Sequence, residues 1–393
     1  MRGKNILVIK LGALGDVALS LPHIMKLAET HANDRVSLLT APACAELAAG
    51  LPLQVVSFQR KGFVEMLRLM RWLPGQQFDV VYDLQGSLRS RLMTQLTQAE
   101  KRVGRRAGVA YTHVPAVSTS GLHAFERFNA VLVAGGVEAA SPASKVPVSN
   151  AVTSRVTAWL QQQGLAGKKL VPVHAGSSRD WPAKRWPEAY FRSLAASLQD
   201  HGLQVVWIGS QDEQSLNERL AAHAGIDATA EFGLDGLLAL AAQAVFAVSN
   251  DSGPMHVLAA AGLPVYAFFG PTDWRRSHAL GQAERVLFKP VSCSPCHLPV
   301  CPPQQGHVCM QGMTPAAVIK RLAADGVLPT QDNCQAFYNR PGRHALHAHM
   351  PLLRRADRQM AGTARHRLEQ HALSLPEGMT APPVRRSKEG IHR

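Results

Sequence analysis

A carboxylate follows a glycine turn near the start of the chain, in Gly12-Ala-Leu-Gly-Asp16. The apolar run before the turn, residues 6–9, is typical of a buried strand, and residues 17–27 carry the apolar spacing of a helix. Ligands of open α/β sheets bind beyond the carboxyl ends of strands, so Asp16 is expected to face a crevice where chemistry can occur. A helix N-cap explains the same residue as well. The Gly-x-x-Gly spacing differs from the dinucleotide fingerprint, which argues against a nicotinamide enzyme.

Three loops in the second half of the chain hold groups that suit a bound nucleotide. The first, residues 175–187, contains two serines that can donate to phosphate oxygens and a lysine that can neutralise them. The second, residues 209–213, ends in a glutamate that fits a ribose or a helix start equally well. The third, residues 249–256, opens a helix whose first N–H groups and dipole favour a diphosphate. The candidate residues are Ser177, Ser178, Lys184, Glu213, Asp251, Ser252, Gly253 and His256.

Basic residues gather around the ends of the early strands. They include Lys10 in the first turn, Arg89 after the turn Asp83-Leu-Gln-Gly86, and the run Lys101-Arg-Val-Gly-Arg-Arg106. Such charges are usually solvated, and Asp83 suits a helix cap as well as a binding role. Beside a crevice they could also hold a phosphate or a carboxylate. Trp181 and Trp186 lie in the first nucleotide loop, residues 175–187, which we call the first phosphate loop; residues 249–256 are the third phosphate loop. Both tryptophans are equally consistent with packing and with ligand contact.

The elements that must position these groups alternate between strand and helix. In the first half we expect strands at 35–40, 54–58 and 78–84 with helices at 63–73 and 87–96. Residues 138–150 are typical of a linker, and the alternation then restarts, with strands at 170–174, 204–208, 245–248 and 265–269 and helices at 188–199, 213–223, 234–242 and 255–261. This order predicts two doubly wound, parallel-sheet α/β domains.

Composition limits the classes of partner. The chain has 393 residues, 46% of them hydrophobic, with a formal net charge of +14. No long apolar run and no signal-like start is present, so we expect a cytosolic protein. The positive charge could attract nucleic acid, an anionic membrane or an acidic substrate. No nucleic-acid-binding motif accompanies it, and nucleic acid is the least supported of the three.

Taken together, the segments 9–17, 83–86, 177–184, 249–256 and Phe269-Gly-Pro-Thr-Asp273 resemble glycosyltransferase family 9 in order and spacing. That family contains the ADP-heptose:lipopolysaccharide heptosyltransferases, and the resemblance covers roughly residues 5–325. It implies a GT-B fold, in which two Rossmann-like domains face a cleft. The expected parts are an acceptor-side domain at 1–150, a nucleotide-sugar domain at 151–328 and a basic, partly disordered tail at 329–393.

The resemblance implies an inverting transferase that moves heptose from ADP-L-glycero-D-manno-heptose to the inner core of lipopolysaccharide, at the cytosolic face of the inner membrane. Asp16 matches the family's base. Ser177, Ser178 and Lys184 match positions around the donor diphosphate, Glu213 lies near the ribose, and Asp251, Ser252, Gly253 and His256 match positions around diphosphate and sugar. No metal and no cofactor are expected. The acceptor is acidic, which makes Lys10, Arg89, Lys101, Arg102, Arg105 and Arg106 candidate acceptor contacts.

Other functions stay open at this point. A related GT-B transferase could use another nucleotide-sugar or acceptor, and a non-catalytic nucleotide-sugar-binding protein would bind ADP without transfer. Cys293, Cys296, Cys301 and Cys309 fall within 17 residues. They are either reduced thiols or zinc ligands, since a cytosolic protein rarely forms structural disulfides. The basic tail could hold the enzyme at an anionic membrane. Which heptose is added, and the oligomeric state, are not encoded in these motifs.

Overall fold

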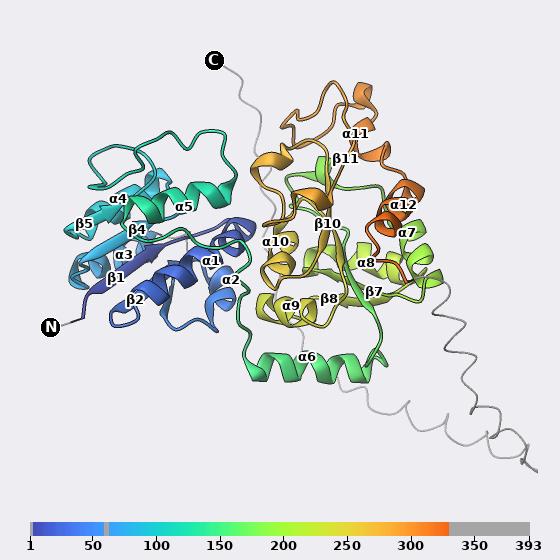
Figure 1. The fold of residues 1–393 in the computed structure, drawn as a ribbon, viewed down its shortest axis with the longest axis horizontal. Helices are drawn as coiled ribbons and strands as arrows, with labels where there is room; N and C mark the ends of the chain where they lie inside the picture. The colour runs from blue at the N-terminus through green and yellow to red at the C-terminus, as the bar shows by residue number, and fades with distance from the viewer. Residues whose placement is uncertain (1–2, 59–62, 330–393) are drawn as a thin grey trace, which may run out of the picture. The chain divides into compact units, whose positions relative to one another are not determined.

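The structure contains two parallel sheets. It is a computed structural model that describes residues 3–58 and 63–329. The region expected to be a tail therefore lies almost wholly outside the described residues. The strands are β1 Asn5–Ile9, β2 Arg35–Thr40, β3 Gln54–Ser57, β4 Val80–Asp83, β5 Lys101–Val103, β6 Leu170–His174, β7 Gln204–Gly209, β8 Ile226–Thr229, β9 Ala247–Asn250, β10 Val265–Phe269 and β11 Val286–Phe288. Figure 1 shows the first sheet in blue to teal and the second in green to orange.

Helices connect the strands and cover the faces of both sheets (Figure 1). They are α1 Leu14–Thr30, α2 Pro42–Ala45, α3 Phe63–Gly75, α4 Leu88–Leu96, α5 Ala124–Ala134, α6 Asn150–Gln162, α7 Glu188–Asp200, α8 Gln214–Ala221, α9 Leu234–Ala241, α10 Gly253–Ala260, α11 Val308–Gln311 and α12 Pro315–Ala324. None of the helices in the described part of the chain is both long enough and apolar enough to span a bilayer.

The order of the strands creates one switch point in each sheet. The first sheet runs β3-β2-β1-β4-β5 and the second β11-β10-β9-β6-β7-β8, with all pairs parallel. The chain therefore reverses its direction of winding between β1 and β4, and again between β6 and β9. Loops diverge at such points and leave room for a ligand beyond the strand ends. The Asp16 turn follows β1, and the first and third phosphate loops follow β6 and β9.

The alternation of side chains along each central strand builds two core layers. In β1, Ile6 and Val8 pack under α1 and α5, whereas Leu7 and Ile9 belong to the layer with α3 and α4. All four are fully buried. The layer under α1 also contains Val257 and Ala260 of α10, so α1 and α10 share one hydrophobic core. This shared core sets the distance between the turn that carries Asp16 and the helix that carries His256.

Candidate active site

Asp16 lies in the first turn of α1 and is not its N-cap. The N-cap is Ala13, and no side chain caps this helix. The helix-cap explanation of Asp16 is therefore wrong, although a carboxylate in the first turn still interacts favourably with the helix dipole. Its side chain is half exposed, and one carboxylate oxygen lies 4.0 Å from Lys10 Nζ. The carboxylate is thus both accessible and next to a fixed positive charge.

Lys10 is the buried cation of this site. Only 2% of it is exposed, and its ammonium lies 3.5 Å from the Leu84 carbonyl and 4.6 Å from the centre of the Phe128 ring. Burial lowers the pKa of Lys10 to about 8, although Asp16 and Asp83 act in the opposite direction. A buried ammonium destabilises the fold, and a charge buried at such a cost beside a carboxylate is typical of functional sites.

We expect Lys10→Met to stabilise the fold at pH 7. The pKa of about 8 in the folded protein lies below the ordinary lysine value of 10.5. Between these values the unfolded chain holds a proton that the folded chain lacks, so stability rises with pH across that window. At pH values below this window, burying the charged ammonium of Lys10 costs roughly 3 kcal/mol, because one pKa unit corresponds to about 1.4 kcal/mol. Urea unfolding at pH 7 and pH 9.5 checks this.

The Lys10→Met variant should be more stable than the wild type at pH 7 and should lose most of the pH-dependent rise in unfolding free energy. A variant that is less stable at pH 7 but keeps the same rise would assign the titration to another group. Transfer activity should fall in the same variant, because Asp16 loses its neighbouring cation.

Two glycines allow α1 and α10 to approach at their first turns. A Cβ on Gly15 would lie 2.7 Å from Cδ2 of His256, and a Cβ on Gly253 would lie 2.8 Å from Cδ2 of Leu14. Gly12 has φ near 142°, which L side chains rarely adopt. The glycines flagged in the sequence therefore serve a sharp turn and a close helix contact. This contact brings Asp16 and His256 near enough for the Asp16 charge to affect the His256 pKa.

His256 is buried and incompletely paired. Its Nδ1 has no hydrogen-bond partner among the described residues. Burial lowers the pKa of His256, with Asp251 and Asp16 opposing that effect, so the ring is neutral at pH 7. A buried, unpaired ring nitrogen beside a carboxylate is the kind of group that a bound ligand completes.

The turn after β4 holds the glycine turn in place. Asp83 is 1% exposed, and its Oδ1 accepts from the N–H groups of Gln85 and Gly86. Gln85 Oε1 in turn accepts from the N–H groups of Leu11 and Gly12. Burial raises the pKa of Asp83, although the Tyr111 hydroxyl, which donates to Oδ2, acts against this. Of the two interpretations of Asp83, the helix cap is wrong, because Ser87 caps α4. Asp83 organises the loop beside Asp16.

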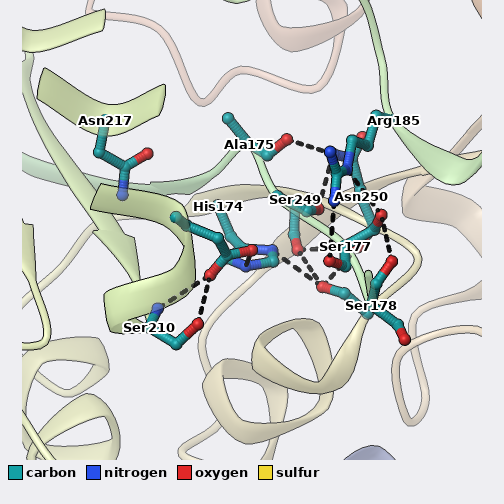
Figure 2. Close-up of polar contacts among 12 residues, drawn as sticks. His174, Ala175, Ser177, Ser178, Arg185, Ser210, Asn217, Ser249 and Asn250 are labelled. Carbon is teal, nitrogen blue, oxygen red and sulfur yellow. Dashed lines mark hydrogen bonds and ion pairs between the residues drawn. The ribbon is translucent and has the colours of Figure 1, made fainter. Parts of the chain in front are cut away.

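The two phosphate loops of the second sheet are tied together by Asn250. Its side-chain amide donates to the carbonyls of Ala175 and Gly176, and its Oδ1 accepts from the N–H of Trp186. Figure 2 shows Asn250 and Ser249 beside His174 and Ala175, at the ends of β9 and β6. Trp186 is buried and stacks on Phe268 at 4.3 Å. Of the two interpretations of Trp186, packing and ligand contact, the structure therefore supports packing.

Lys184 and Asp251 form the central ion pair of these loops. Lys184 Nζ lies 2.8 Å from Asp251 Oδ2, which also accepts from Thr272 Oγ1 at 2.6 Å. The lysine is 5.1 Å from the centre of the Trp181 ring. Asp251 is 6% exposed, so this pair is largely desolvated. Lys184 thus stands at the start of α10, where an anion would be attracted by both the lysine and the helix N-terminus.

The serines of the first phosphate loop differ in what they can reach. Ser177 is buried, donates to the Trp181 carbonyl and accepts from Arg185 Nε at 3.0 Å, so its hydroxyl is committed to the loop. Ser178, next to Ser177 in Figure 2, is exposed. Of the two, Ser178 is the one whose hydroxyl is accessible to a ligand.

A glutamate–histidine–serine chain connects the remaining predicted residues. His174 Nε2 lies 3.0 Å from Glu213 Oε1, and Ser252 Oγ lies 2.9 Å from His174 Nδ1. Burial opposes the charged form of Glu213, but hydrogen bonds from His174 and Ser210 outweigh it and lower the pKa of that carboxyl. With Nε2 protonated, His174 accepts from the Ser252 hydroxyl. His174 was not predicted as a site residue, because in the sequence it is only the last residue of the expected strand 170–174.

Arginines from both halves of the chain line a basic cavity of about 360 Å³. Arg105 and Arg106 are two of the candidate acceptor contacts. Arg127 of α5 and Arg276 after β10 were not predicted, because they are distant in sequence and belong to no motif. Burial lowers the pKa of Arg105 and of Arg127, and neighbouring arginines act in the same direction. The charge of Asp16 partly opposes this lowering for Arg127.

Other basic candidates are used differently. Lys101 Nζ donates to the Gly135 carbonyl, and the Arg102 guanidinium donates to the carbonyls of Ala99 and Ala110. These two residues hold loops together. Arg89 lines a separate, apolar cavity on α4.

The cysteine segment surrounds a small cavity of about 90 Å³, lined by Cys293, Cys296, Cys301 and Cys309. All four are free thiols, and burial raises the pKa of Cys309. His307 Nε2 bonds the Ala183 carbonyl. Within residues 3–58 and 63–329, no three His, Cys, Asp or Glu side chains are arranged to share a metal ion.

Two parallel α/β sheets with polar loops at both switch points are the architecture of GT-B glycosyltransferases, and solved structures share the fold. ADP-heptose heptosyltransferase II of E. coli superimposes with a TM-score of 0.64 at 22% identity, covering 81% of this chain and 98% of that one. An E. coli heptosyltransferase solved with ADP-2-deoxy-2-fluoro heptose gives 0.61 at 20% identity, covering 82% and 99%. The expectation of a GT-B fold is confirmed.

Sequence comparison identifies the family. Residues 66–306 match the model of glycosyltransferase family 9 (heptosyltransferase). Lipopolysaccharide heptosyltransferase 1 of Pseudomonas aeruginosa is 26% identical over 321 residues, which cover 76% of this chain and 87% of that protein. The family match spans more than half of the chain, so the protein belongs to glycosyltransferase family 9 and is a glycosyltransferase. The resemblance stated from the motifs is confirmed.

Proposed function

We propose that this protein transfers heptose from ADP-L-glycero-D-manno-heptose to the acidic inner core of lipopolysaccharide, with inversion at the anomeric carbon. The observation that carries the proposal is the contact between the first turns of α1 and α10. It puts an accessible carboxylate, Asp16, beside a helix N-terminus that is suited to a diphosphate. The named activity of the similar proteins from P. aeruginosa and E. coli supports heptose as the sugar.

In the proposed reaction, Asp16 accepts the proton of an acceptor hydroxyl as its oxygen attacks the anomeric carbon. The bond from that carbon to the diphosphate breaks in the same displacement, and ADP leaves with the electron pair. Lys184 and the N-terminus of α10, at Ser252 and Gly253, stabilise the charge that develops on the leaving group. The buried ammonium of Lys10 lies 4.0 Å from the Asp16 carboxylate, and the unpaired Nδ1 of His256 completes the donor site.

The two sheets take different substrates in this proposal. Residues 1–150 form the acceptor-side domain and residues 151–328 the nucleotide-sugar domain. Ser178, Lys184 and Asp251 contact the diphosphate and sugar, and Ser177 shapes that loop from behind. Glu213, whose two carboxylate oxygens are held by His174 and Ser210, lies near the ribose. The basic cavity of Arg105, Arg127 and Arg276 takes the carboxylates of the acceptor, because arginine recognises carboxylates in a planar, two-bond geometry.

The working location that we propose is the cytosolic face of the inner membrane, where a lipid-anchored acceptor is presented. Peripheral contact with that membrane follows from the chemistry of such an acceptor. The region beyond residue 329 carries an excess of arginine, which would attract an anionic lipid surface.

A transfer assay with the full chain tests the proposal. ADP-heptose is offered with truncated inner-core acceptors that carry Kdo, and UDP- and GDP-sugars are offered in parallel. Product is expected only from ADP-heptose, and acceptors with esterified carboxylates should react more slowly. Transfer from a UDP- or GDP-sugar instead would point to a related transferase. ADP binding without transfer to any acceptor would point to a nucleotide-sugar-binding protein.

A further inference from the structure

An apolar cavity of about 740 Å³ lies in the first half of the molecule, outside the site described above. It is formed by α3, α4 and the segment 108–111, and its lining includes Met66, Leu69, Leu92, Leu96 and Val109. α3 and α4 pack against each other and cover one face of the first sheet. Neither the proposed donor site nor the basic acceptor cavity uses this volume.

The rim of this cavity exposes apolar side chains that a protein surface normally avoids. Leu88 and Val109 are each 85% exposed, and Leu92 is 48% exposed. On α3, Val64, Leu67 and Met70 are also exposed and follow one another at intervals of three residues, which places them along one stripe of the helix. A clustered apolar surface of this kind marks an interaction site.

The same two helices carry the charges that an anionic amphiphile needs. Arg68 and Arg71 lie on α3, and Arg89 and Arg91 lie on α4, with Arg89 and Arg91 lining the cavity itself. Arg91 is 6.0 Å from the centre of the Tyr111 ring, another lining residue. Glu65 is the acidic side chain on these two helices, and it pairs with Arg68. Apolar residues flanked by arginine are the pattern of helices that lie on anionic membranes.

We propose that this cavity binds an acyl chain of an anionic membrane lipid, with Arg91 and its neighbours contacting the headgroup. α4 begins directly after the loop in which Gln85 holds the Asp16 turn, so the lipid surface is one loop away from the carboxylate. This inference rests on the proposed function in one respect: lipid binding would hold the enzyme beside a lipid-anchored acceptor. Lipid binding itself can be measured without any transfer.

The test uses the full chain with vesicles of phosphatidylcholine and phosphatidylglycerol, and with matched vesicles whose acyl chains are brominated. Bromine quenches tryptophan at short range. Trp72 on α3 packs against the core layer that the cavity residues Met66 and Leu96 join, and the other five tryptophans lie after residue 158. We expect brominated anionic vesicles to quench the fluorescence, and Trp72→Phe to remove most of that quenching.

Binding is then compared in three proteins. The double variant Leu88→Glu/Val109→Glu should lose at least tenfold in vesicle affinity. Val133→Glu, at an exposed apolar position of α5, should bind vesicles as the wild type does. The double variant and Val133→Glu should unfold at the same temperature as the wild type. Three outcomes would overturn the proposal. They are equal binding by the double variant, quenching that survives Trp72→Phe, and a self-associated wild type that the double variant converts to monomer, since a second copy would then cover the cavity.

Discussion

Asp16→Asn should lower kcat by about 10²–10⁴-fold, the range that a positioned general base contributes. The amide has nearly the size of the carboxylate but cannot accept the proton of the attacking hydroxyl. The side chain is half exposed and caps no helix, so the fold should tolerate the change. Donor affinity should be unchanged, because the groups around the diphosphate belong to the second sheet. Steady-state transfer and calorimetric titration with ADP measure the two quantities separately.

The matched control is Glu29→Gln, which removes a carboxylate from the exposed end of the same helix. Its kcat should equal that of the wild type. If Asp16→Asn transfers sugar as fast as this control, another group is the base. If ADP binding falls together with kcat, Asp16 acts by arranging the donor site and not by proton transfer.

The location of the site followed from local sequence because of a property of parallel sheets. Loops that follow buried parallel strands lie at one edge of the sheet, so the loops that carry Asp16, Lys184 and Asp251 could be named as candidates from the strands before them. The strand order adds what the motifs leave open. It shows that β1 and β4, and likewise β6 and β9, are neighbours at a switch point, so the loops that follow them diverge and flank one crevice.

Short edge strands were harder to predict. β5 is three residues long and contains Lys101 and Arg102, and β8 contains Asp227, so neither has an apolar run. Their pairing with β4 and β7 supplies the hydrogen bonds that local propensity does not specify. The central strands, which are buried on both faces, had the clearest apolar pattern.

Residues that depend on long-range contacts could not be found from motifs. Arg127 and Arg276 reach the basic cavity from elements 149 positions apart, and nothing in their neighbourhoods distinguishes them from solvated arginines. His174 looked like the last residue of a strand, yet it bridges Glu213 and Ser252. Conversely, Ser177 and Arg102 have suitable side chains, but those side chains are already bonded within their own loops.

Lys184→Ala should raise the donor KM by roughly 10- to 100-fold with a smaller effect on kcat. A hydrogen bond to a charged group contributes about 1.5–3 kcal/mol, and each 1.4 kcal/mol corresponds to about tenfold in affinity. The lysine is the cation paired with Asp251 at the start of α10. An exposed lysine of the same half, Lys168, supplies the control, since it precedes β6 and the first phosphate loop follows that strand at its other end. Lys168→Ala should leave the donor KM unchanged.

A second variant separates the loss of the Lys184 cation from distortion of its loop. Removing Lys184 leaves buried Asp251 without its cation, with the Thr272 hydroxyl as its side-chain partner among the described residues. A loss of donor affinity could then come from a distorted loop. The double variant Lys184→Met/Asp251→Asn replaces the ion pair by neutral groups of similar size. It should recover the thermal stability that Lys184→Ala loses while its donor KM stays high, because the phosphate still lacks its cation. Recovery of a normal donor KM in the double variant would mean that Lys184 serves only to neutralise Asp251, and the diphosphate would then be held by α10 alone.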